Sequence, residues 1–343
     1  MSNHSLFLDL AARGVRMPIG TDLVLSEKPH HGAIKIDGPA LGAVMAEAAE
    51  RWRVPLAMPL MDLSLEKEWL GQAFGVASAD IPTWHWSGDA TNSLPQGSQT
   101  PRLEANNAAI RYIHDHTNLV PCGMSIGPFS LVTKLLADPI TPVFLAGLGE
   151  SEDPEVLQFE TLLELATQTV LKLAEAQIDA GAEVLVVCEP AANTVYFSPK
   201  QLEEGADTFE RYVLQTNRRV VDLLARRKVQ LVFHDCGELT DGMVREFSNL
   251  GPAMLSLGSS RCLWHDSTLV AKNTVLYGNL PSKQFYSDSL MPVSRVIEEA
   301  RQLEKNMRST GHPFILGSEC DVLDVPGSSA SIRAKVSAML MDA

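Results

Sequence analysis

The chain is 343 residues long, hydrophobic residues make up 45% of it, and its formal net charge is −14 at pH 7. This length allows one large α/β domain or two smaller ones, and the apolar content is ample for a packed core. The acidic balance argues against a nucleic-acid-binding surface, because such a surface needs a basic footprint.

Membrane and secretory segments are not expected. No apolar stretch approaches the roughly 18 residues of a membrane span, and Met1–Leu10 has neither a basic region nor a long apolar run. The five cysteines are odd in number and lack framework spacing, which favours a reducing compartment. We therefore expect a cytoplasmic protein.

The first half of the chain is the less regular one. We treat residues 1–50 as an N-terminal extension. Pro55–Met61 is strand-like and leads into Asp62-Leu-Ser-Leu-Glu66. Residues 81–101 are rich in Pro, Gly, Ser, Asn and Thr. Loops of about 15 residues or more are uncommon inside a compact domain and often functional, so we expect a lid or an ordered extension across the rim of the fold.

The second half alternates between helix-like and strand-like segments. Ser198-Pro199 supplies an N-cap followed by proline at the first helical position, and Arg226-Arg227-Lys228 complements the C-terminal dipole of the same helix. In chain order we expect a helix over Pro154–Ala180, a strand over Ala182–Cys188, a helix over Pro199–Arg227, a strand over Val229–Phe233, a helix near Thr240–Asn249, strands over Ala253–Leu257 and Val275–Tyr277, a helix near Pro292–Ser309, a strand over Phe314–Gly317 and a helix near Ser328–Met341.

Continuous apolar strands that alternate with helices are typical of a parallel sheet covered on both faces. The number of strand–helix units and the chain length favour an α/β fold of the closed (β/α)8 type, a TIM barrel, over an open sheet. No Gly-x-Gly-x-x-Gly or P-loop sequence follows a strand, which argues against nucleotide binding. We expect a single barrel domain over residues 1–343, with the N-terminal extension at its start and residues 81–101 as a rim loop.

His234, Cys236 and Cys320 are the most informative residues for function. His-x-Cys follows the apolar run Val229–Phe233, and Cys320 follows a second run, Pro313–Gly317. Two thiolates and an imidazole at strand ends would form a zinc site with three protein ligands, and catalytic zinc keeps its fourth position open. Active sites of such barrels lie at the C-terminal ends of the strands. The alternative is that the three side chains fill core space, since free Cys packs like a small hydrophobe.

Several further segments keep a common order along nearly the whole chain. They are Asp62-Leu-Ser-Leu-Glu66, Gly123-Met-Ser-Ile-Gly-Pro-Phe129, Gly181-Ala-Glu-Val-Leu-Val-Val-Cys-Glu-Pro190, His234-Asp-Cys-Gly237, Tyr277-Gly-Asn-Leu280 and Gly317-Ser-Glu-Cys-Asp-Val322. Together they resemble the uroporphyrinogen decarboxylase-like superfamily, in particular its zinc-dependent corrinoid methyltransferase branch, which includes the methylcobamide:coenzyme M methyltransferases.

The resemblance implies a methyl transfer in which zinc on His234, Cys236 and Cys320 activates the acceptor. A methylated corrinoid (methylcobalamin-like) on a separate corrinoid-binding protein would dock over the barrel mouth. A thiol such as coenzyme M suits zinc, because coordination deprotonates a thiol and the thiolate is the nucleophile. Tetrahydrofolate is the alternative small-molecule methyl acceptor.

Three more polar residues are candidates for the site. Glu189 ends its strand where the branch commonly has an acidic residue, so the resemblance implies a fourth zinc contact or a proton acceptor. A solvated carboxylate beside Pro190 is the alternative. Asn279 and Asp62 are candidates for substrate binding at the barrel mouth, although Asn279 also suits a turn after Gly278.

Two other functions stay open, a lyase of the uroporphyrinogen decarboxylase type and a non-catalytic metal-containing binding protein. The decarboxylases carry an N-terminal Arg-Gln-Ala-Gly-Arg motif that binds substrate carboxylates, whereas here Arg13 and Arg16 stand apart without it. Cys262, His265 and Asp266 lie close together in the sequence, but we do not predict a second metal there.

Overall fold

The centre of the molecule is one eight-stranded parallel sheet, seen in a computed structural model that describes residues 5–95 and 100–341. The strands are β1 (Arg16–Ile19), β2 (Leu56–Ala57), β3 (Val120–Ile126), β4 (Val184–Cys188), β5 (Gln230–Asp235), β6 (Met254–Leu257), β7 (Val275–Leu280) and β8 (Phe314–Asp321). Their order in the sheet is β1-β8-β7-β6-β5-β4-β3-β2.

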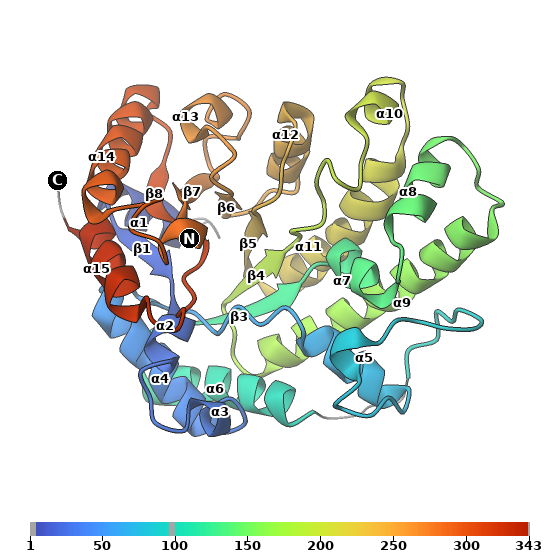
Figure 1. Cartoon of the computed structure of the whole chain (residues 1–343), viewed down its shortest axis with the longest axis horizontal. Helices are drawn as coiled ribbons and strands as arrows, with labels where there is room; N and C mark the ends of the chain where they lie inside the picture. Colours follow the sequence, from blue (N-terminus) through green and yellow to red (C-terminus); the bar gives the residue numbers. More distant parts are fainter. Residues whose placement is uncertain (1–4, 96–99, 342–343) are drawn as a thin grey trace.

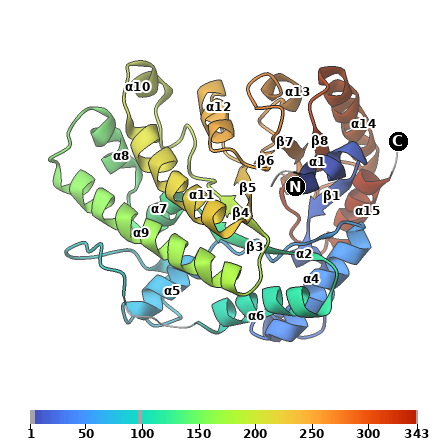
Figure 2. The same ribbon diagram turned by 180° about the vertical axis from the view of Figure 1, so that it is seen from behind.

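Helices surround this sheet (Figures 1 and 2). Ser198 accepts a hydrogen bond from Gln201 N and begins its helix as predicted, with proline next to it. The α-helices are α1 (Ser5–Ala12), α2 (Thr21–Leu25), α3 (His31–Ile34), α4 (Gly38–Trp52), α5 (Leu65–Ala73), α6 (Pro101–His116), α7 (Pro128–Leu135), α8 (Ile140–Gly147), α9 (Pro154–Asp179), α10 (Pro199–Glu203), α11 (Gln215–Arg227), α12 (Asp241–Asn249), α13 (Leu263–Asp266), α14 (Val293–Thr310) and α15 (Ser329–Leu340). Short 3-10 helices cover Ile81–Thr83 and Ser282–Gln284, and a π-helix covers Glu210–Leu214.

The sheet curls until its two end strands, β1 and β2, approach each other. Thr21, just after β1, donates a hydrogen bond of 2.7 Å from Oγ1 to the carbonyl of Met58, just after β2. Within residues 5–95 and 100–341, β1 and β2 form no backbone pairing of their own. The curled parallel sheet with helices outside it is consistent with the predicted (β/α)8 barrel.

The predicted N-terminal extension over residues 1–50 is not confirmed. β1 lies inside that segment and pairs with β8, with Arg16 opposite Leu316. The segment therefore supplies a strand of the sheet and the helix α4, which packs against α6. Its strand is only four residues long and contains a proline, so its pattern resembled a loop.

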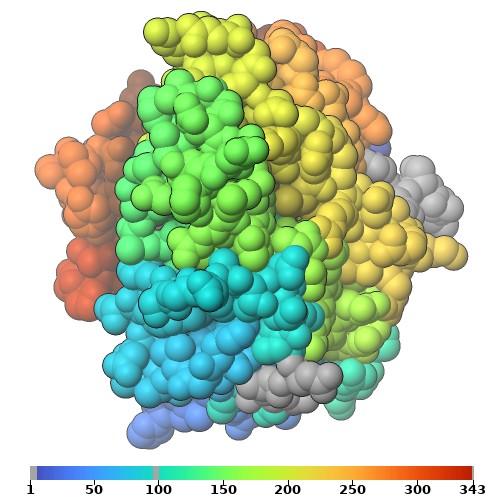
Figure 3. Space-filling model, turned by 90° about the vertical axis from the view of Figure 1, so that its right-hand side faces the viewer, coloured from blue at the N-terminus to red at the C-terminus, as the bar shows by residue number. Residues whose placement is uncertain are grey.

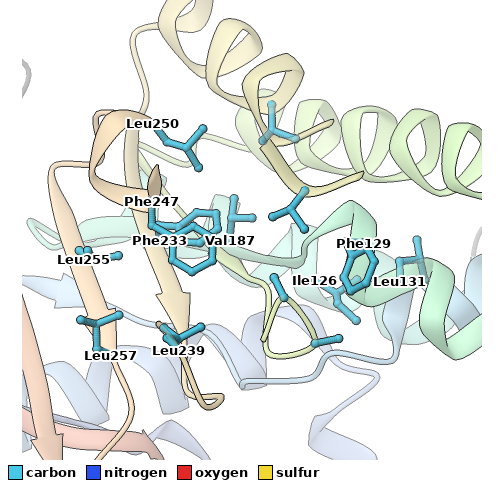
Figure 4. Packing of buried hydrophobic residues seen from close by; sticks show 14 of the residues in the cluster. Ile126, Phe129, Leu131, Val187, Phe233, Leu239, Phe247, Leu250, Leu255 and Leu257 are labelled. Atoms are coloured by element: carbon cyan, nitrogen blue, oxygen red, sulfur yellow. The ribbon is translucent and has the colours of Figure 1, made fainter. Parts of the chain in front are cut away.

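Alternate residues of strands such as β4 and β5 face two different apolar clusters, as the period of a β-strand requires. In β4, Val186 belongs to the inner cluster and Val187 to the outer cluster, which lies between the sheet and the helices. The outer cluster includes Phe233 of β5 and Phe247 of α12, whose ring centroids are 4.8 Å apart (Figure 4). These layers hold the strand ends, and any side chains on them, in fixed positions.

Most elements predicted for the second half are present within a few residues of their expected bounds. The helix predicted over 199–227 is wrong in its middle, since α10 ends at Glu203 and Gly205 has a positive φ of 96°. The strand predicted over 55–61 is reduced to Leu56–Ala57. β8 extends to Asp321, which places Cys320 inside the strand.

The described part of the predicted rim loop, residues 81–95, packs on the helices. Trp86 N donates to Leu135 O of α7 at 2.7 Å, and its ring meets Phe74 edge-on with centroids 4.9 Å apart. Gln158 of α9 donates to Gly88 O at 3.3 Å. Figure 3 shows this cyan segment against the green surface that includes α9. Residues 96–99 of the predicted loop lie outside the described residues.

In the part of the chain that the structure describes, no single helix is long and apolar enough to cross a membrane. The neighbouring helices α7 and α8 reach that length and composition only as a pair, and the pair is bent by 120°.

Candidate metal centre

His234, Cys236 and Cys320 meet at the C-terminal ends of two strands that are not neighbours. His234 lies in β5, Cys236 is the first residue after that strand, and Cys320 is the second-last residue of β8. β6 and β7 separate these strands in the sheet, so only the curl brings their ends together. The candidate ligand atoms of the three residues lie within 4.8 Å of one another, and the two Sγ atoms are 3.9 Å apart.

The ring of His234 is oriented by the next strand. Nδ1 lies 2.8 Å from Ser256 Oγ in β6, and the two residues are register partners across the β5–β6 pairing. Nε2 is buried and has no hydrogen-bond partner among the described residues. A metal-ligating histidine characteristically engages its other ring nitrogen in this way. Nε2 is therefore the atom available to a metal.

The two thiols shift each other's pKa in opposite directions. Hydrogen bonding with Cys320, helped by His234 and Lys283, lowers the pKa of Cys236. The same hydrogen bond, together with burial, raises the pKa of Cys320. Burial lowers the pKa of Lys283, but the charges of Cys236 and Glu319 outweigh it and raise that pKa. Metal binding would remove the protons that the two thiols still carry, because metal-ligating thiols are deprotonated.

This donor set fits zinc. One imidazole nitrogen and two thiols are ligands that zinc prefers, and three protein ligands are the number found in catalytic zinc sites. The orphaned Nε2 is the observation that most favours a cation, because a buried polar atom without a partner is costly. The three predicted ligands are therefore together, in a geometry suited to zinc.

Met61 is a neighbour of the centre that the sequence analysis missed. Its Sδ lies 3.8 Å from Cys320 Sγ. It stands just past β2, and only the curl of the sheet brings it next to β8. The one available signal was its position at the end of a strand-like run, and methionine is common at the end of such runs for packing alone.

Glu189 is placed at the end of β4, where its carboxylate binds the N-terminus of α7. Oε1 accepts from Phe129 N at 3.1 Å and from Asn217 Nδ2 at 2.8 Å, and Oε2 accepts from Ser130 N at 2.8 Å. Burial raises the pKa of Glu189, although these hydrogen bonds oppose the shift. The side chain is fully buried, so it is not a solvated carboxylate. Its part in metal binding or proton transfer stays a prediction.

The two predicted substrate-binding residues both have structural partners. Asn279 Nδ2 donates to Gly258 O at 2.7 Å and to Arg261 O at 2.9 Å, which ties β7 to the loop after β6. Asp62 accepts from Ser64 Oγ at 2.6 Å and forms an ion pair with Arg102. Contact of either residue with a substrate stays a prediction.

A second group of possible metal ligands, Asp241, His265 and Asp266, already has a cation. Arg261 forms ion pairs with Asp266 and, at 2.7 Å, with Asp241. His265 Nε2 lies 2.8 Å from Asp241. The guanidinium therefore offsets part of the negative charge of these two carboxylates.

Comparison with known proteins gives matches to one family. Residues 39–330 match the family described as Uroporphyrinogen decarboxylase (URO-D). The chain is 25% identical over 158 residues to the methylcobamide:CoM methyltransferase MtbA of Methanosarcina mazei, covering 46% of this chain and 42% of that protein. It is 28% identical over 123 residues to MtbA of Methanosarcina acetivorans, covering 35% and 31%. It is 26% identical over 208 residues to the uroporphyrinogen decarboxylase of Roseobacter denitrificans, covering 60% and 56%.

The matches thus span less than two thirds of the length of each of these relatives. A solved methyltransferase from Methanosarcina mazei shares the fold, with a TM-score of 0.63 and 17% identity over 95% of this chain and 92% of that chain. The relatives agree with the resemblance to the corrinoid methyltransferase branch that the sequence motifs carry.

Proposed function

We propose that this chain, which belongs to the uroporphyrinogen decarboxylase (URO-D) family, is a methyltransferase that holds zinc on His234, Cys236 and Cys320. It moves a methyl group between a corrinoid on a partner protein and a small-molecule acceptor. The observation that carries the proposal is the convergence of two thiols and a free imidazole nitrogen at one end of the sheet. The similarity to two methylcobamide:CoM methyltransferases supports the reaction class.

The chain's own residues prepare the centre for a thiol or similar acceptor. Zinc, when bound, supplies a cation that deprotonates a thiol and leaves its sulfur nucleophilic. Ser256 keeps the His234 ring in position. Met61 places an apolar, polarisable side chain beside Cys320. The ammonium of Lys283 balances the negative charge that two thiolates bring to the site.

The proton released by the acceptor needs a base. Glu189 is the proposed catalytic residue for this step, since a buried carboxyl with a raised pKa binds a proton near neutral pH more readily than an exposed one. To do so it must exchange one of its hydrogen bonds from Phe129, Ser130 or Asn217. We propose that Asn279 and Asp62 border the acceptor at the same end of the sheet.

Coenzyme M or another thiol, and tetrahydrofolate, are the proposed acceptors, and the corrinoid protein is the proposed partner. The partner would approach the C-terminal ends of the strands, because the donor set lies there. Decarboxylation is disfavoured by the position of Arg16, which begins β1 at the opposite end of the sheet and pairs with Glu304 at 2.8 Å.

Metal analysis and a methyl-transfer assay test the proposal in sequence. Wild-type protein should contain zinc near one equivalent, the Cys236→Ala, Cys320→Ala double variant should lack it, and the matched control Cys262→Ala should retain it. Zinc retained in the double variant would refute the site. With zinc shown, methylcobalamin should be demethylated in the presence of a thiol or tetrahydrofolate. The absence of a spectral change with every acceptor would refute methyl transfer.

A further inference from the structure

We propose that a cavity between α5, α6 and α7, apart from the metal centre, binds an oxyanion of a small molecule. The cavity has a volume of about 500 Å³, and its wall includes Lys67, Lys134, Arg102, His85 and Glu68. α5 contacts both α6 and α7, and Figure 1 shows α7 next to α5. None of the three proposed zinc ligands lines it.

Arg102 does not supply the free positive charge of this cavity. Its guanidinium pairs with Glu68 at 2.6 Å and with Asp62. It also donates to Ser64 Oγ at 3.3 Å. Arg102 is thereby held rigidly at the cavity wall, with two carboxylates already matched to it.

Lys67 and Lys134 supply positive charge to this cavity without forming an ion pair with a carboxylate among the described residues. Lys67 is 7% exposed, and among the described residues it donates only to the backbone carbonyl of Pro82, at 3.3 Å. The ammonium of Lys134 forms no ion pair or hydrogen bond with any residue in 5–95 or 100–341. Buried charges are costly unless they are paired, so the buried Lys67, with the half-buried Lys134 beside the same cavity, favours a bound anion.

The titration of both lysines agrees with this arrangement. Burial lowers the pKa of Lys67, and the charge of Lys134 lowers it further. Burial also lowers the pKa of Lys134, against the attraction of Glu66. Glu66 is the buried neighbour of Lys67 in α5, and its Oε1 accepts from Ser125 Oγ at 2.6 Å. The attraction of Glu66 thus acts on Lys134, and an anion in the cavity would supply a negative charge to Lys67.

The chemical class of the ligand follows from the donors. Two ammonium groups, with the imidazole of exposed His85 at the mouth, suit the oxygens of a phosphate or carboxylate group. Ser64 in the cavity wall is three residues from Met61, the neighbour of Cys320, so their Cα atoms lie within about 11 Å. An extended molecule could therefore have its anionic end here and its reacting end at the metal centre, a last step that rests on the proposed function.

Isothermal titration with inorganic phosphate and with succinate, at constant ionic strength, tests the cavity. Wild-type protein should bind at least one of the two, and the stronger one identifies the oxyanion as a phosphate or a carboxylate group. Lys134→Gln and Lys67→Gln should each weaken binding about tenfold or more, since they remove a charge-assisted hydrogen bond. Lys134→Arg should keep most of the affinity.

The control is Lys200→Gln in α10, whose side chain is 82% exposed and which should bind like wild type. Because Lys67 is buried, circular dichroism should first show that its variant is folded, and Lys134→Gln carries the test if it is not. Binding by the zinc-deficient Cys236→Ala, Cys320→Ala variant should be unchanged, which separates this inference from the proposed function. No binding of either anion to wild type, or equal affinity in Lys134→Gln, would overturn it.

Discussion

Replacing Ser256 with alanine tests whether the hydroxyl in β6 sets the metal affinity of the centre. The wild-type hydroxyl lies 2.8 Å from His234 Nδ1, and both side chains are 1% exposed. Without it, the ring loses the contact that leaves Nε2 directed at the two thiols. The substitution changes no proposed ligand.

The size of the effect follows from these contacts. Loss of a residue that orients a metal-ligating histidine characteristically weakens metal affinity by about 10–100-fold. This corresponds to roughly 1.4–2.8 kcal/mol of binding free energy. In the metal-free protein, Nδ1 would join Nε2 as a buried atom without a partner, at a cost of about 1–3 kcal/mol in folding stability.

Zinc affinity is measured by competition with a chromophoric chelator, and stability by urea unfolding of the metal-free protein. Ser256→Thr keeps the hydroxyl and should restore most of the affinity. The matched control is Ser248→Ala, another buried serine, whose Oγ accepts from Ala271 N at 2.9 Å in a different part of the fold. It should lower stability and leave zinc affinity unchanged. Equal zinc affinity in wild type and Ser256→Ala would refute the orienting role.

Three further outcomes are expected from the buried structure. Burial raises the pKa of Glu66 from 4.5 to about 7, so the folded state keeps a proton that the unfolded chain releases. The free energy of unfolding should therefore fall as the pH rises across that range. In urea unfolding, Glu66→Gln should make this fall about 3 kcal/mol smaller than in wild type. Parallel pH profiles of wild type and variant would contradict the raised pKa. In Gly317→Ala the new Cβ would lie 2.3 Å from the Tyr277 ring, so thermal unfolding should show a stability about 1–3 kcal/mol lower than that of wild type. The control is Gly32→Ala, whose new Cβ would have no atom within 4 Å. Equal melting temperatures of the two variants would contradict the contact. Phe233→Ala should cost about 3–5 kcal/mol in urea unfolding, because its ring is 1% exposed in the outer cluster, and a loss below 1 kcal/mol would show that the cluster repacks.

Local pattern was enough to predict much of the fold. The apolar runs around Val184 and Phe233 are buried strands, and the long polar–apolar repeat from Pro154 is a 26-residue helix. Serine and proline marked the start of α10 and Arg227 the end of α11, but the predicted single helix is interrupted in its middle, where Gly205 has a left-handed conformation. The N-terminal strand β1 was missed, because four residues carry too little periodicity to be recognised.

The ligands of the proposed zinc site could also be predicted from the sequence, since His234 and Cys236 follow one apolar run and Cys320 follows another. Their meeting depended on tertiary structure alone. Eighty-four residues and two intervening strands separate Cys236 from Cys320, and the curl of the sheet closes that gap to 3.9 Å. The same curl brings in Met61 from the segment after β2, which no local pattern connects to β8.

The hydrogen-bond partners of these side chains were likewise determined only by the tertiary structure. The sequence predicted Glu189 at a strand end, but in the folded chain its carboxylate accepts hydrogen bonds from the N-terminus of α7 and from Asn217. In the folded chain Nδ1 of His234 contacts Ser256, and Nε2 has no hydrogen-bond partner among the described residues. Sequence determines which chemistry each strand end can offer, because strand periodicity and residue type are local. Which of those groups stay free to react depends on contacts between distant strands, and those exist only once the sheet has curled.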